Sequence, residues 1–328
     1  MKLVFVLLLY TSFALAQDSL RVSIGRVGNA SDTLTKTQGG FVLAGGGKDV
    51  DAAMKWLLTR SGGGDVVIIR ASGSVGYNDY LFELHPVNSV ETLLIDSREK
   101  AMLPETAEKI RNAEALFIAG GDQWNYVKYW KDTEVSKAIK FLIDEKKVPI
   151  GGTSAGCAVL SEFIFDAQFD TVVSADALAN PYTQAVSISK SFINIPFLKN
   201  TIADQHYSQR NRQGRHVTFM ARMMQDFKIK NPKGIAADER TAVCIDEKGN
   251  AIVFGSGKAF FLSAKKSPEL CINSKPLTWN HEGKALSVWS YQATEQGTPA
   301  FNLNQWPTQK ADAYWSIKAG ELIQSPIN

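Results

Sequence analysis

Residues 148–163 read VPIGGTSAGCAVLSEF, and this stretch decides the fold that we expect. It opens with a short apolar run at 148–150, which is typical of a buried strand. Small residues follow, as in a helix that packs tightly on a sheet. The Gly-x-Ser-x-Gly pattern at 152–156 marks the junction, where such a turn strains the serine backbone and lifts its hydroxyl above the sheet. Ser154 is therefore either a nucleophile on an elbow or the N-cap of the helix.

Strand-like and helix-like segments alternate around this stretch. The alternation predicts an α/β fold with a doubly wound, mainly parallel sheet. Functional sites in such sheets gather at the carboxyl ends of the strands, and glycines follow several of the runs, at 45–47, 120–121 and 151–152. The strand-like runs are Gly40–Leu43, Val66–Ile69, Thr92–Ile95, Leu116–Ala119 and Val148–Ile150, and the helix-like segments include Asp51–Arg60, Thr106–Asn112 and Ser136–Lys146.

The N-terminus has the features of a secretory signal peptide. Lys2 precedes an apolar run at 3–10, and Ala-Leu-Ala at 14–16 fits a cleavage site after Ala16. We therefore expect removal of residues 1–16 and a secreted or periplasmic protein. No other segment approaches 18 consecutive apolar residues, so we expect no membrane span.

The remaining composition predicts a folded domain with a β-rich addition. The chain is 45% hydrophobic, and its 36 basic residues nearly balance 33 acidic ones, which argues against nucleic acid as a partner. We expect an α/β domain at 17–264 and a β-rich C-terminal extension at 265–328. The sequence leaves open whether the extension covers a cleft, forms a homodimer or docks to a surface.

The three cysteines show no spacing typical of a metal site, and we predict neither a metal nor a cofactor. Cys157 follows the elbow and is expected to be a small buried apolar residue. Cys244 and Cys271 could form a disulfide in an exported protein. The sequence leaves that pairing open.

A serine nucleophile needs a neighbouring base, which is itself oriented by a third group. Of the four histidines, His206 is the strongest candidate. It lies in IADQHYSQRNRQGR at 202–215, directly after a short apolar run. Three arginines follow it: Arg210, Arg212 and Arg215.

These segments resemble the cyanophycinase and peptidase E family of serine peptidases, and the cyanophycinases most. The resemblance implies a fold like that of class I glutamine amidotransferase domains, which is flavodoxin-like, with serine in the place of cysteine. It extends over residues 40–262. The shared elements, in the family's order, are FIAGGDQ at 117–123, GGTSAG at 151–156, DQHYSQRNRQGR at 204–215 and, more loosely, GIAADERTA at 234–242.

The resemblance implies a catalytic role for three residues. Ser154 would be the nucleophile and His206 the general base. In the family the acid lies between them, and SADALANPY at 174–182 matches the family segment best, which favours Asp176. Asp170 is the second choice, and Glu162 and Asp166 are the other candidates.

The resemblance also implies a substrate pocket. Backbone N–H groups of Gly121 and Ala155 would bind the oxyanion, and Gln123, Asp204 and Gln205 match pocket residues. Guanidinium groups bind carboxylates bidentately, so the three arginines suit a substrate with an acidic group beside the scissile bond. Two structural alternatives stay open: the arginines form a solvated helix face, or Asp204 pairs with one of them.

The resemblance therefore implies an exported serine peptidase that hydrolyses β-aspartyl-type peptide bonds, such as the β-Asp-Arg links of the polymer cyanophycin. An aspartyl or isoaspartyl dipeptidase is the alternative enzyme. A binding protein without activity on the same scaffold is the alternative outside enzymes.

Overall fold

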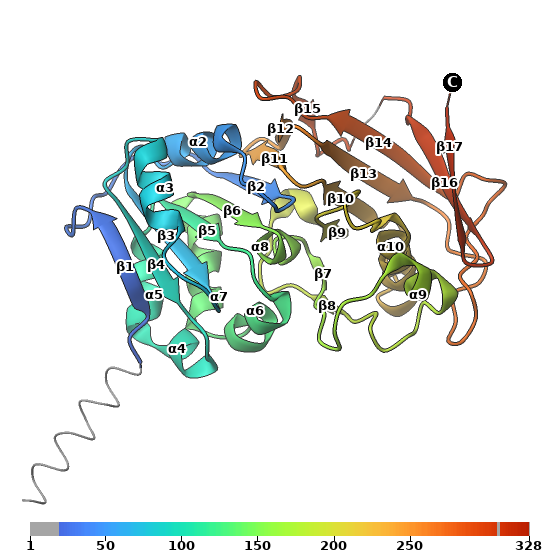
Figure 1. The fold of residues 1–328 in the computed structure, drawn as a ribbon, viewed down its shortest axis with the longest axis horizontal. Helices are drawn as coiled ribbons and strands as arrows, with labels where there is room; N and C mark the ends of the chain where they lie inside the picture. The colour runs from blue at the N-terminus through green and yellow to red at the C-terminus, as the bar shows by residue number, and fades with distance from the viewer. Residues whose placement is uncertain (1–19, 307–308, 328) are drawn as a thin grey trace, which may run out of the picture.

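Two β-sheets lie side by side in the protein, and helices pack on their faces (Figure 1). The structure is a computed structural model that describes residues 20–306 and 309–327. The signal peptide predicted at residues 1–16 lies outside the described residues.

The first sheet has the parallel core that the sequence predicts. Strands β4, β3, β5, β6 and β2 run parallel in that order, and antiparallel strands extend the sheet at both edges. All five predicted strands are present, although β4 begins at Ser89 rather than at Thr92. In sheet order the strands are β1 (Ser23–Gly28), β4 (Ser89–Leu94), β3 (Asp65–Arg70), β5 (Ala115–Ile118), β6 (Pro149–Thr153), β2 (Gly40–Ala44), β11 (Thr241–Asp246), β12 (Asn250–Gly255) and β15 (Phe301–Asn302).

Helices cover both faces of this sheet. Successive side chains along its strands point to opposite faces, and each face packs against helices in a core of its own. Along β5, Ala115 and Phe117 join the core beneath α2 (Asp51–Arg60), whereas Leu116 and Ile118 join the core on the other face. Helix starts follow local signals: Pro104 opens α5, and Asp122 caps α6. The other helices are α3 (Tyr77–Leu84), α4 (Arg98–Met102), α5 (Pro104–Asn112), α6 (Gln123–Trp130), α7 (Glu134–Phe141), α8 (Ala155–Ala158), α9 (Ser174–Ala179) and α10 (Gln213–Asp226), with a π-helical turn at Leu142–Lys146 and a 3₁₀ turn at Pro196–Leu198.

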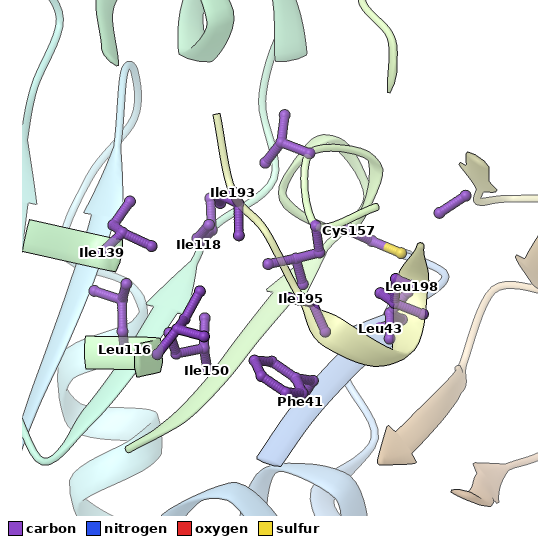
Figure 2. Packing of buried hydrophobic residues seen from close by; sticks show 14 of the residues in the cluster. Phe41, Leu43, Leu116, Ile118, Ile139, Ile150, Cys157, Ile193, Ile195 and Leu198 are labelled. Atoms are coloured by element: carbon purple, nitrogen blue, oxygen red, sulfur yellow. The ribbon is translucent and has the colours of Figure 1, made fainter. Parts of the chain in front are cut away.

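The segment before β9 closes one of these cores. Figure 2 shows Ile195 and Leu198 near Phe41 and Leu43 of β2, and the same cluster includes Ile193. All five side chains are buried. This segment therefore fixes the approach of the chain to β9, which leads to His206.

The second sheet joins the α/β part of the chain to its C-terminal extension. Strands β7, β9 and β10 run parallel, and the remaining strands are antiparallel. The extension predicted at 265–328 is β-rich, and its strands β14, β16 and β17 continue the sheet from β13. In sheet order the strands are β17 (Glu321–Pro326), β16 (Ala313–Lys318), β14 (Leu286–Gln292), β13 (Lys258–Ala264), β10 (Lys233–Ala237), β9 (Thr201–Asp204), β7 (Phe163–Phe165) and β8 (Ile188–Lys190).

An aromatic cluster connects the two sheets. The ring of Phe261, on β13, makes edge contacts with Tyr291, Phe301 and Trp306 at centroid distances of 5.0 to 5.8 Å. Phe301 belongs to β15, which pairs with β12 of the first sheet. The extension is therefore tied to the α/β part by apolar packing as well as by strand pairing.

The cysteines are free and buried in this structure. Cys244 lies in the core beneath α2, whereas Cys271 lies in the core of the second sheet. Their positions in two different cores explain why the disulfide left open by the sequence does not form. Within residues 20–306 and 309–327, no group of three or more His, Cys, Asp and Glu side chains is arranged to hold a metal ion. In the same part of the chain, no helix combines the length and the apolar character needed to cross a bilayer.

Replacing Phe261 by alanine should lower the free energy of unfolding by about 3–5 kcal/mol, because the change leaves a cavity among three aromatic rings. Urea denaturation followed by circular dichroism measures this. Phe169→Ala is the matched control: that side chain is 46% exposed, and its loss should cost about 0.5 kcal/mol or less. Equal losses in the two variants would contradict the role of the aromatic cluster.

Candidate functional site

The turn from β6 into α8 holds Ser154 in a strained conformation. Its φ of 52° and ψ of −117° lie in a region that residues with a side chain rarely adopt. A Cβ atom at Gly152 would collide with the carbonyl oxygen of Gly156, and one at Gly156 would collide with that of Ile118. The Ser154 side chain makes no capping hydrogen bond to α8. The turn therefore has the geometry of the nucleophile elbow, and the capping alternative does not hold.

The Ser154 hydroxyl faces the imidazole of His206. Ser154 Oγ lies 2.8 Å from His206 Nε2, although 52 positions separate the two residues along the chain. The His206 backbone N–H donates to the carbonyl of Gly45. A Cβ atom at Gly46, where φ is 91°, would lie 2.5 Å from ring atoms of His206. The loop after β2 therefore forms a wall that packs directly against the imidazole.

A carboxylate orients the other side of the ring. His206 Nδ1 lies 2.6 Å from Oε1 of Glu239, in the loop between β10 and β11. A proton on Nδ1 donates to this carboxylate, which leaves the Nε2 lone pair free to accept the serine proton. Glu239 is held in turn by Gln209, whose side-chain oxygen accepts from the Glu239 backbone N–H at 2.9 Å.

Strand pairing explains why His206 and Glu239 meet. Strands β9 and β10 are parallel neighbours, with Ala236 paired to Asp204. Their carboxyl ends lie at the same edge of the sheet, so the loops that follow them are adjacent. The sequence carried this signal in GIAADERTA, where an acidic pair follows an apolar run. Glu239 follows His206 in the chain, whereas the resemblance implies an acid between Ser154 and His206.

The acid predicted from the resemblance, Asp176, is not the one beside His206. It lies on α9 as an exposed residue, in a helix that packs on α10. The other candidates also have different partners: Asp170 accepts from Thr171 N–H, Asp166 from the Ser187 hydroxyl, and Glu162 from Asn200 N–H. Among the described residues, the carboxylate hydrogen-bonded to His206 is that of Glu239.

The two groups predicted to bind the oxyanion flank Ser154. Ala155 is the first residue of α8, where a backbone N–H has no partner within the helix. Gly121 lines the same pocket as Ser154, and a Cβ atom at the preceding Gly120 would lie 3.5 Å from Ser154 Cβ. Ala155 thus follows Ser154 directly in the chain, and Gly121 lies in the wall of the same pocket.

A pocket of about 410 Å³ opens beside Ser154. It contains nearly all of the residues that the sequence predicts for substrate binding. Asp204 is the exception, since it is buried and does not line the pocket. The pocket residues are Gly121, Asp122, Gln123, Trp124, Ser154, Ala167, Gln168, Asp170, Thr171, Gln205, Arg210, Arg212 and Arg215.

The three arginines do not play the same part. Asp204 accepts from Arg215 through both oxygens, at 2.9 and 2.6 Å, and Arg212 Nη1 lies 3.5 Å away. Arg212 also donates to the backbone oxygen of Gln205 at 2.8 Å. The structural alternative for Asp204 therefore holds. Burial raises the pKa of Asp204, but the charge and hydrogen bonds of Arg215 outweigh it, so the pKa lies below its usual value.

Arg210 is the guanidinium left for a substrate. It is exposed, and its side chain has no hydrogen-bond partner within residues 20–306 and 309–327. Its charge lowers the pKa of His206 after the larger effect of burial. An anion bound at Arg210 would therefore lie near the imidazole.

Burial keeps His206 ready to accept a proton. Removal from water lowers the pKa of the imidazole below its ordinary value of 6.5, although Glu239 opposes the shift. The hydrogen bond from His206 lowers the pKa of Glu239. At neutral pH the site therefore combines a neutral imidazole with an ionised carboxylate.

Comparisons with known proteins point to one family. The model of peptidase family S51 matches residues 77–253. The cyanophycinase of Synechococcus elongatus is 28% identical over 231 residues, which cover 66% of each chain. The cyanophycinase of Trichormus variabilis is 27% identical over 177 residues, or 54% of each chain. The chain thus spans just under two thirds of the length of the first relative and about half of the second.

A solved structure shares the fold. The peptidase from an acI-B1 Actinobacterium superimposes with a TM-score of 0.51 at 16% identity, over 81% of this chain and 98% of that one. The similarity covers the α/β architecture described above.

Changing Glu239 to glutamine should lower the pKa of His206 further, because the variant removes the anion that favours the imidazolium. An NMR titration of the histidine ring nitrogens follows this shift directly. Asp176→Asn is the matched control and should leave the titration midpoint in place. A midpoint that moves in the Asp176 variant and not in the Glu239 variant would contradict the assignment.

Proposed function

The chain belongs to peptidase family S51, and on this premise we propose that it is a serine peptidase with Ser154, His206 and Glu239 as its catalytic residues. The observation that carries the proposal is the continuous pair of hydrogen bonds from Ser154 Oγ to His206 and from His206 to Glu239, at 2.8 and 2.6 Å. A binding protein without activity would not need this arrangement on a strained elbow.

The reaction follows from the direction of these bonds. His206 Nε2 takes the hydroxyl proton as Ser154 Oγ bonds to the scissile carbonyl carbon. The carbonyl oxygen becomes an oxyanion next to the N–H groups of Gly121 and Ala155. The imidazolium, paired with Glu239, then donates its proton to the leaving amine, and an ester to Ser154 remains. Water repeats the same steps, which frees the acid product.

We propose a substrate with an aspartyl residue at the scissile bond. Arg210 would bind the carboxylate of that residue, since Arg212 and Arg215 are occupied by Asp204. The matching relatives are cyanophycinases, which favours the β-Asp-Arg links of cyanophycin over a dipeptide. Export through the N-terminal segment 1–16 is part of the proposal and would direct the protein to polymer outside the cell.

Ser154→Ala should lower kcat roughly a million-fold, because the variant has no nucleophile. Glu239→Gln should cost about 10²- to 10⁴-fold, since the amide no longer stabilises the imidazolium. Asp176→Asn should stay within about twofold of the unmodified protein. Hydrolysis of β-Asp-Arg provides the assay, and unchanged circular dichroism shows that the variants fold.

The pH profile provides a further check on the same base. In the unmodified protein, kcat/KM should rise as pH rises through the pKa of His206 and then stay flat. Because burial lowers that pKa, the rise should be complete at a lower pH than for an ordinary histidine. A midpoint above 6.5 would argue against His206 as the base.

A panel of β-Asp-Arg, α-Asp-Arg and dipeptides without aspartate tests the substrate. We expect kcat/KM for β-Asp-Arg to exceed that of the dipeptides without aspartate by roughly 100-fold or more. Arg210→Gln should remove most of this preference, whereas Arg111→Gln, a change on α5, should not. Cleavage of dipeptides but not of cyanophycin would favour the dipeptidase alternative, and equal rates across the panel would discard the role of Arg210.

A further inference from the structure

A second pocket lies away from Ser154, at the start of β10. Its volume is about 410 Å³, and residues of β13, of β14 and of the loop around 305–306 form most of its wall. We call it the Lys233 pocket. The lining residues are Asn231, Lys233, Ser263, Ala264, Lys265, Ser287, Trp289, Gln305 and Trp306.

The charge of this pocket is positive and unbalanced. Two lysines line it, and the lining contains no acidic residue. The Nζ atom of Lys233 lies 4.6 Å from the centre of the Trp306 ring. Within the part of the chain that the structure describes, this amine has no hydrogen-bond or ion-pair partner. Burial lowers the pKa of Lys233. A half-buried ammonium group usually has an anion beside it, and this one does not.

The other polar groups of the pocket are mostly donors or can act as donors. Trp306 is only 7% exposed and contributes its ring, which lies against Lys233; its Nε1 is buried without a hydrogen-bond partner among residues 20–306 and 309–327, so it is not one of the donors at the pocket surface. The indole N–H of Trp289, by contrast, donates to the carbonyl of Gln309. The Asn231 and Gln305 amides add further N–H groups. A ligand that complements this set is an anion with several acceptor oxygens, as in a carboxylate.

The distance to the catalytic residues sets the size of the ligand. Strand β10 runs from Lys233 to Ala237, and Glu239 follows it. At about 3.3 Å per residue, roughly 15 Å of strand separates the Lys233 pocket from the loop of Glu239. Because β10 is buried beyond Lys233, a bound peptide has to pass around the strand, so it needs at least about five extended residues. A dipeptide held at Ser154 therefore cannot reach Lys233, whereas a polymer can.

We propose that the Lys233 pocket is an exosite, which binds a carboxylate of a peptide polymer while another segment of the same polymer lies at Ser154. The polymer as occupant rests on the proposed function. The carboxylate chemistry does not, because it follows from the unpaired lysine and the donors around it. The C-terminal extension thereby gains a role, since its residues build most of the pocket.

Direct binding tests the pocket without catalysis. The probe is poly-L-aspartate of about ten residues, titrated onto the Ser154→Ala protein at 0.15 M salt, which screens distant charges. We expect Lys233→Met to weaken binding about tenfold. Lys230→Met removes the same charge from an exposed position outside the pocket and should leave the affinity within twofold. Equal losses in both variants, or a loss in Arg210→Gln alone, would overturn the proposal.

Kinetics then tests the link to the substrate. With cyanophycin, Lys233→Met should raise KM about tenfold and leave kcat unchanged, while KM for the β-Asp-Arg dipeptide stays the same. A parallel change in KM for both substrates would overturn the exosite. If the protein cleaves neither substrate, the proposed function fails, and the poly-L-aspartate titration still decides whether the pocket binds carboxylate.

Discussion

The buried ion pair between Asp204 and Arg215 holds the site together. Both side chains are 2% exposed, and the Arg215 guanidinium also lies 5.0 Å from the ring centre of Phe165 and 5.7 Å from that of Phe219. Two charges removed from water at this depth are tolerated only when their geometry is nearly complete, and loss of one partner typically costs about 3–5 kcal/mol. The pair fixes the end of β9 to α10, and His206 follows Asp204 by two residues. The position of His206 therefore depends on the ion pair between Asp204 and Arg215.

The three residues proposed for catalysis come together where the two sheets meet. Ser154 follows β6 of the first sheet, whereas His206 and Glu239 follow β9 and β10 of the second. The loop after β2 connects them through its backbone, because Gly45 accepts from His206 N–H and Gly46 accepts from Arg240 N–H. A change in the relative placement of the sheets would separate the serine from its base.

The sequence predicts local features of this arrangement well and distant pairings poorly. The parallel core and the elbow depend on residues that are close in the chain, so their patterns can be read directly. His206 was recognisable by its surroundings. The segment that contains Glu239 was recognisable too, but its contact with His206 was not, because that contact depends on the pairing of β9 with β10. Asp176 fitted a chain order taken from the resemblance, but α9 holds it at the surface. The different roles of Arg210, Arg212 and Arg215 likewise depend on which of them are buried, and their spacing in the sequence does not predict that.

The wall formed by Gly46 has a consequence for the energetics of turnover. A catalytic side chain that is mobile before the reaction loses rotational freedom as the transition state forms, and that loss adds to the activation barrier. Here the main chain of Gly46 packs so closely against the His206 ring that a Cβ atom there would lie 2.5 Å from it, and Ser154 and Glu239 hold the two ring nitrogens. The His206 ring therefore loses its conformational entropy when the protein folds, and this loss does not add to the barrier of each catalytic cycle.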